Sequence, residues 1–257
     1  MQQTRFTDDG ACIRWTGTPG TGPALVYVHG LGAASSVYFA HIAADPVLAG
    51  RRSLLVDLPG HGISDRPAAF GYTLEEHADA LAAVLDAAGT GPADVVGHSM
   101  GGAVAIVLAA RRPDLVARLV LAEANLDARP RVTAGSSGIA AFTEEEFVHG
   151  GGFARVLERV GPQWAATMRL ADPVALHRTA SSLLRGSDPV MRELLLSSPV
   201  PRTFLQGESS GDLTGRAELE AAGVSVVTVP GAGHNIMFDN AYAFVEAIAR
   251  NRSSVSV

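Results

Sequence analysis

A sharp turn between a short apolar strand and a helix is the feature that most restricts how this chain can fold. Residues 93–96 predict a buried strand, residues 101–112 predict a helix stopped by Pro113, and the junction reads Gly-His-Ser-Met-Gly-Gly. So tight a turn needs small residues two positions before and after Ser99, where Gly97 and Gly101 stand. Ser99 is therefore a candidate nucleophile; the alternative is a serine that only caps the helix.

Short apolar strands alternate with longer helical patterns along most of the chain. This alternation predicts an α/β fold, in which a largely parallel sheet is covered by helices on both faces and the crossovers are right-handed. Residues 5–7 and 11–16 flank an Asp-Asp-Gly turn and predict an opening hairpin. The other predicted strands are 24–28, 53–57, 93–96, 119–123, 202–205 and 224–229, and the predicted helices are 35–44, 74–88 behind a Thr73 cap, 101–112 and 240–250.

The alternation stops between residues 127 and 199, where no strand is evident. Helical patterns take its place, over residues 143–160, 163–170, 173–184 and 189–196. We interpret residues 127–199 as a helical cap, or lid, inserted into a core formed by residues 1–126 and 200–257.

Composition narrows the classes of partner. The net charge of −6 comes from 20 basic and 26 acidic residues without a basic block, which argues against nucleic acid and anionic membranes. No apolar run approaches the roughly 20 residues that span a bilayer. Cys12 alone cannot build a disulfide framework, and the first residues lack the apolar core of an export signal, so we expect a cytoplasmic protein.

His234 is the candidate base for Ser99. It follows the last predicted strand in the sequence Pro-Gly-Ala-Gly-His and precedes the last helix. Strand ends on one edge of a parallel sheet converge in space, so a separation of 135 residues (234 − 99) is no obstacle. A surface or helix-capping histidine is the alternative.

The glycine-rich segment His29–Gly32 follows the strand at 24–28. A serine nucleophile needs backbone N–H groups that hold the oxyanion, and we expect Met100 and Leu31 to supply them. His29 itself is expected to bond loop backbone. The same segment, with Asp57 after the next strand, imitates a dinucleotide-binding fingerprint, but its third glycine is missing.

A carboxylate should orient His234, and two candidates fit. Glu123 closes the apolar strand at 119–123, whereas Asp212 follows the strand at 202–205. The residues alone leave both open, although Asp212 also has the character of a solvated loop charge.

Four motifs, in the same order, resemble those of the α/β-hydrolase family over nearly the whole chain. They are residues 29–32, 57–65, 97–102 and 231–234. The resemblance implies an eight-stranded, mostly parallel sheet, a lid between the sixth and seventh strands, and a triad of serine, acid and histidine. It makes residues 57–65 a loop that shapes the pocket.

The resemblance also bears on the acid. Most members carry an aspartate three residues after the glycine that ends the seventh strand, and this chain has Ser210 there. Some relatives, including a branch of the haloalkane dehalogenases, place a glutamate at the end of the sixth strand, so Glu123 is preferred to Asp212. Dehalogenase chemistry is not implied, because those enzymes need an aspartate nucleophile and a halide-binding side chain where this chain has Ser99 and Leu31.

The sequence thus predicts a serine hydrolase that acts without metal or organic cofactor on a small to medium carboxylic ester, lactone or thioester. Ser99 would attack, His234 would carry the proton, and Glu123 would orient His234. We expect a monomer or homodimer whose only partner is its small-molecule acyl substrate. The alternatives are a carbon–carbon bond hydrolase or perhydrolase with the same triad, a hydrolase-derived small-molecule receptor, and a dinucleotide-binding dehydrogenase.

Overall fold

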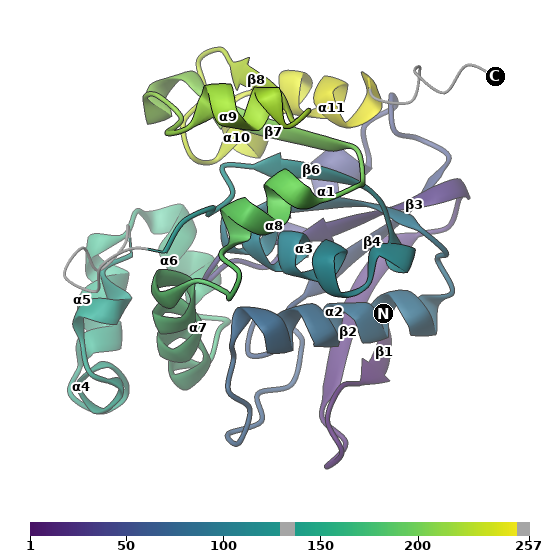
Figure 1. The fold of residues 1–257 in the computed structure, drawn as a ribbon. Helices are drawn as coiled ribbons and strands as arrows, with labels where there is room; N and C mark the ends of the chain where they lie inside the picture. The colour runs from purple at the N-terminus through teal and green to yellow at the C-terminus, as the bar shows by residue number, and fades with distance from the viewer. Residues whose placement is uncertain (129–136, 251–257) are drawn as a thin grey trace.

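One eight-stranded sheet runs through the molecule (Figure 1). The computed structural model describes residues 1–128 and 137–250, and its strand order is β1-β2-β4-β3-β5-β6-β7-β8. The first two strands pair antiparallel and β2 is antiparallel to β4, whereas the remaining pairs are parallel. The predicted α/β fold with a mostly parallel eight-stranded sheet is confirmed. The strands are β1 (Gln2–Arg5), β2 (Cys12–Thr18), β3 (Thr21–Val28), β4 (Arg51–Asp57), β5 (Ala93–His98), β6 (Val116–Ala122), β7 (Arg202–Gly207) and β8 (Ser225–Val229).

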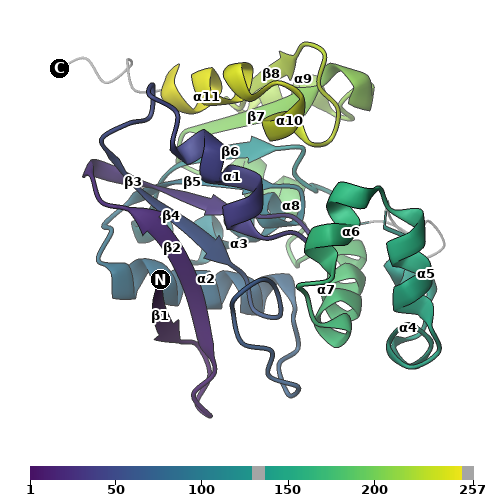
Figure 2. The same ribbon diagram turned by 180° about the vertical axis from the view of Figure 1, so that it is seen from behind.

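Helices cover both faces of the sheet (Figures 1 and 2). Successive residues of β3 point to opposite faces, so Val26 and Val28 belong to one apolar core and Leu25 and Tyr27 to the other. The first core includes residues of α2 (Leu74–Ala88), α3 (Met100–Arg111), α8 (Met191–Ser197) and α9 (Arg216–Ala221), and the second includes α1 (Ser35–Ala43), α10 (Ile236–Asp239) and α11 (Ala241–Arg250).

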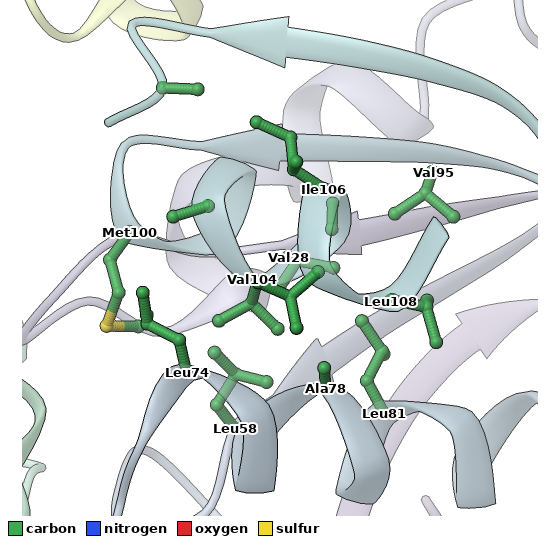
Figure 3. Packing of buried hydrophobic residues seen from close by; sticks show 14 of the residues in the cluster. Val28, Leu58, Leu74, Ala78, Leu81, Val95, Met100, Val104, Ile106 and Leu108 are labelled. Atoms are coloured by element: carbon green, nitrogen blue, oxygen red, sulfur yellow. The ribbon is translucent and has the colours of Figure 1, made fainter. Parts of the chain in front are cut away.

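The contact between α2 and α3 fills the first core (Figure 3). Leu74, Ala78 and Leu81 from α2 face Met100 and Val104 from α3, and all five are buried. This packing anchors the helix that follows Ser99 on the sheet.

Local capping explains why α2 has the predicted bounds. The Thr73 side chain accepts from the Glu76 amide, and the Glu76 side chain accepts from the Thr73 amide, which satisfies two amides at the helix start. Gly89 ends the helix with φ 57°.

Only helices lie between β6 and β7 in the described residues. They are 3₁₀ turn η3 (Ile139–Ala141), α4 (Glu144–Val148), α5 (Gly152–Arg159), α6 (Pro162–Met168), α7 (Pro173–Arg185) and α8. The prediction of one helix over 143–160 is wrong, because Gly150 and Gly151 interrupt it and Gly151 has φ 77°. Helices α4–α7 gather beside one end of the sheet in both views. Residues 129–136 of the predicted cap lie outside the described residues, and the division into core and cap stays a prediction.

Two predicted strands need correction, and two short helices were missed. The first strand lies at Gln2–Arg5 and not at 5–7, and the short helices α9 and α10 were not predicted. The sixth strand ends at Ala122, one residue before Glu123, because Glu123 has φ 50° and cannot continue an extended strand. Within the described residues, every helix is too short or too polar to cross a bilayer.

Four buried histidines are held neutral. The rings of His29 and His61 lie 5.1 Å apart, and those of His61 and His77 lie 6.3 Å apart. Burial lowers the pKa of His29 to about 4, those of His61 and His98 to about 3, and that of His77 well below its ordinary value. His77 also joins two helices, since its Nε2 lies 3.0 Å from Oγ1 of Thr179 on α7.

These histidines should make the protein acid-sensitive. Their folded pKa values lie below the ordinary 6.5, so the unfolded chain binds protons more readily as the pH falls from 6.5 towards 4, and the free energy of unfolding falls with it. Each such histidine adds a slope of up to about 1.4 kcal/mol per pH unit. Urea unfolding between about pH 7.5 and pH 5 should show a shallower slope for His77→Gln than for wild type. The exposed His149 gives the control, because His149→Asn should keep the wild-type slope. Equal slopes in all three proteins would contradict the assignment.

Candidate active site

Ser99 stands at the corner between β5 and α3 in a strained conformation. Its φ of 52° and ψ of −118° are rare for a non-glycine residue, and its amide donates to the Ala122 carbonyl at 2.9 Å. A Cβ at Gly97 would lie 2.6 Å from the Gly101 carbonyl oxygen, and a Cβ at Gly101 would overlap the carbonyl oxygens of Val28 and His29. The requirement for small residues at 97 and 101 is confirmed.

Glu123 and His234 lie side by side. Glu123 directly follows β6, and His234 lies in the loop after β8. Glu123 Oε2 is 3.6 Å from His234 Nδ1. The other carboxylate oxygen, Oε1, accepts from the Gly207 amide at 2.6 Å, which fixes its orientation. Glu123 is 13% exposed and His234 is 50% exposed, so a mostly buried carboxylate faces an accessible imidazole.

Asp212, the other candidate acid, has no such partner. It is exposed, and its carboxylate makes no hydrogen bond or ion pair with another described residue, although it lines the same cavity as Ser99. The geometry thus favours Glu123 over Asp212 as the neighbour of His234.

His98 supports the backbone of the His234 loop. Its Nε2 donates to the His234 carbonyl at 2.9 Å, and the two ring centroids are 4.9 Å apart. Burial lowers the pKa of His98 to about 3, so this neighbour carries no charge at neutral pH.

The two amides predicted to bind an oxyanion lie at the starts of a loop and a helix. Met100 is the first residue of α3, where an amide has no partner within the helix, and its side chain points into the core beside Leu74 (Figure 3). Leu31 follows Gly30, whose Cβ would lie 3.3 Å from Ser99 Cβ, so this loop passes directly over the serine. The Leu31 carbonyl accepts from Trp164 Nε1 at 2.7 Å.

His29 has the predicted structural role. Its Nε2 accepts from the Leu58 amide at 3.0 Å, so Nδ1 carries the proton and donates to the Gly30 carbonyl at 2.8 Å. One imidazole thus ties the loop after β3 to the loop after β4.

Asn125 was not predicted and touches the candidate nucleophile, Ser99, directly. Ser99 Oγ donates to the side-chain oxygen Oδ1 of Asn125 at 3.3 Å, and the backbone N–H of Asn125 donates to the Ser99 carbonyl at 3.4 Å. The available signal was a polar residue two positions after Glu123, just beyond the end of β6.

A cavity of about 330 Å³ opens over these side chains. Ser99, Glu123, Asn125 and His234 all line it. Its apolar wall includes Leu126, Trp164, Leu183, Leu184 and Phe204, and its polar wall includes Asp127, Arg192 and Asp212. Met168 of the same helix as Trp164 is fully buried against Gly32 and does not line the cavity.

Asp57 holds a neighbouring loop and is not free to bind a ribose. Its Oδ1 accepts from the Ser35 amide at 2.7 Å, and its Oδ2 accepts from the Ile63 amide at 3.0 Å. Burial raises the pKa of this carboxyl. Across residues 1–128 and 137–250, no three His, Cys, Asp or Glu side chains gather as a possible metal site.

A parallel sheet with a serine at a strand-to-helix corner, and an acid and a histidine at neighbouring strand ends, defines a hydrolase of the nucleophile-elbow class. Sequence comparison agrees, since the family described as the alpha/beta hydrolase fold matches residues 23–215. The chain belongs to the alpha/beta hydrolase family, and it is a hydrolase.

Curated relatives and solved structures resemble the chain over most of its length. Esterase Rv0045c of Mycobacterium tuberculosis is 31% identical over 93% of this chain and 84% of its own. The 2-(acetamidomethylene)succinate hydrolase of Mesorhizobium japonicum is 30% identical over 84% of this chain and 83% of its own. The structure of an esterase from Exiguobacterium antarcticum, 21% identical, gives a TM-score of 0.75 over 96% of this chain and 98% of that chain, which shows the shared fold.

The backbone contact beneath Ser99 yields a stability prediction. Gly101→Ala should lower the free energy of unfolding by more than about 3 kcal/mol, because the new methyl group meets two backbone oxygens that cannot move independently. Gly161→Ala is the control, since a Cβ there meets nothing within 4 Å and its φ is −57°, and it should stay within about 0.5 kcal/mol of wild type. Urea unfolding measures both, and equal effects would refute the packing argument.

Proposed function

We propose that the protein is a serine hydrolase of small to medium carboxylic esters, lactones or thioesters. The observation that carries this proposal is the Glu123–His234 pair, with its 3.6 Å separation, in the cavity that Ser99 also lines. Such a set of groups can activate a hydroxyl at neutral pH, because the carboxylate stabilises the imidazolium that forms.

In the first half of the reaction, Ser99 Oγ forms a bond to the acyl carbon while its proton passes to His234 Nε2. Glu123 holds the Nδ1 side of the ring, so that Nε2 is the basic nitrogen. The amides of Leu31 and Met100 donate to the oxyanion. The bond to the alcohol or thiol then breaks, and His234 returns the proton to the leaving group.

In the second half, water attacks the acyl-enzyme and gives a proton to His234. The acyl–oxygen bond to Ser99 breaks, Ser99 recovers its proton, and the carboxylic acid leaves. Every proton and bond in this sequence is accounted for by residues of the chain and one water molecule, so the proposed reaction uses no metal or cofactor.

The size and lining of the cavity support a substrate of modest size. A volume of about 330 Å³ lies at the lower end of the roughly 300–1,000 Å³ typical of small-molecule sites. The apolar wall would receive an acyl chain, and the Arg192–Asp127 ion pair at 2.7 Å forms part of a polar wall. The relatives named as esterases agree with this class.

The nucleophile can be tested by covalent labelling. A fluorophosphonate probe should label the wild-type protein at Ser99, whereas Ser99→Ala should remain unlabelled, because phosphonylation needs the activated hydroxyl. Equal labelling of both proteins would refute the assignment of Ser99.

The size of the cavity can be tested with a series of nitrophenyl esters of increasing acyl length. Their hydrolysis should slow once the acyl chain outgrows the cavity.

The two candidate acids can be separated by isosteric amides. Glu123→Gln should lower kcat by about 10³- to 10⁴-fold, because the amide no longer stabilises the imidazolium of His234. Asp212→Asn, the matched control, should stay within about twofold of wild type, since the exposed Asp212 has no partner among the described residues. The reverse pattern, measured with a nitrophenyl ester, would assign the triad to Asp212.

A further inference from the structure

A hydrogen bond joins the helices between β6 and β7 to the loop that follows β3. Trp164 on α6 donates its indole N–H to the Leu31 carbonyl at 2.7 Å. The two residues are 133 positions apart, and both line the cavity over Ser99. The bond therefore crosses from the predicted cap to the loop that carries a proposed oxyanion donor.

Close packing reinforces this bond. Gly32 has φ 66°, and a Cβ there would lie 3.0 Å from Met168 Cε and 3.2 Å from Trp164 Nε1. Thr167 Oγ1 donates to the Trp164 carbonyl at 3.1 Å within the same helix. Helix α6 thus rests directly on the loop, leaves no room for a side chain at Gly32, and is tied to the loop by the indole hydrogen bond.

We propose that Trp164 is a positioning residue that holds the Leu31 amide in the orientation needed to bind the oxyanion. This inference rests on the proposed function. Leu31 lies between Gly30 and Gly32, which give the backbone unusual freedom. The Leu31 N–H shares its peptide plane with the Gly30 carbonyl, which His29 Nδ1 holds at 2.8 Å. The Trp164 bond fixes the next peptide plane, that of the Leu31 carbonyl, so rotation about Leu31 is restricted from both sides. Donors aimed before the charge develops stabilise the transition state most effectively.

Trp164→Phe tests the bond while keeping an aromatic ring in the cavity wall. Losing this bond leaves the Leu31 amide less well aimed at the oxyanion that forms in the transition state, and it should lower kcat about five- to tenfold. KM for a short-chain nitrophenyl ester should stay within about twofold, because substrate binding does not require the oriented amide. A residue that only lines the cavity would instead raise KM and leave kcat unchanged, and that result would overturn the proposal.

Trp15 provides the matched control. Its indole N–H donates to Gln2 Oε1 at 2.6 Å, and it lies on β2, outside the cavity. Trp15→Phe removes the same kind of bond and should leave kcat unchanged. A similar loss of kcat in both variants would show a general effect of losing an indole and would overturn the specific role of Trp164.

Two further measurements distinguish a failure of the proposed function from a failure of this inference. If the fluorophosphonate probe fails to label wild-type Ser99, the proposed function fails and this inference falls with it. If Ser99 is labelled and Trp164→Phe turns over like wild type, this inference alone is overturned. Circular dichroism monitors the folding of each variant. If Trp164→Phe does not fold, kcat is measured for Trp164→Leu instead. A lower kcat would support the role of the bond, and a wild-type kcat would overturn it.

Discussion

The close approach of backbone to backbone beneath Ser99 is the constraint on which the rest of the site depends. The backbone around Gly97 and Gly101, including the carbonyls of Val28 and His29 at the end of β3, is too close to admit a Cβ at either glycine. Ser99 has a positive φ at this contact, and the α2–α3 core holds the helix that follows. The backbone strain here is confined to Ser99, but the helix that follows this residue is held in place by the apolar core on one face of the sheet.

The carboxylate at the end of β6 depends on a second unusual backbone conformation. Glu123 has φ 50°, and its amide still donates to the Leu205 carbonyl of β7 at 2.9 Å. The chain therefore turns immediately after its last sheet bond. Gly207 allows the end of β7 to approach the carbonyls of Ala232 and Gly233, and its own amide binds Glu123. The Glu123 carboxylate, at the end of β6, can thus meet the His234 loop.

Local signals decided which features the sequence could predict. Helix α2 has its predicted bounds because Thr73, Glu76 and Gly89 specify both ends within the segment itself. The elbow glycines and the role of His29 followed from the same kind of short motif. The positive φ of Glu123 and the contact between Ser99 and Asn125 could not be predicted, because both depend on how β6 meets its neighbours. Helices α9 and α10 span six and four residues, too few to show a clear helical period.

The absence of charge on His98 matters for its neighbour His234, the proposed base. A second cation beside His234 would oppose formation of its imidazolium, which the proposed reaction requires twice. His98 lies 4.9 Å from that ring and donates to the His234 carbonyl, yet burial lowers its pKa to about 3. The chain thus uses an imidazole as an uncharged donor to shape the loop.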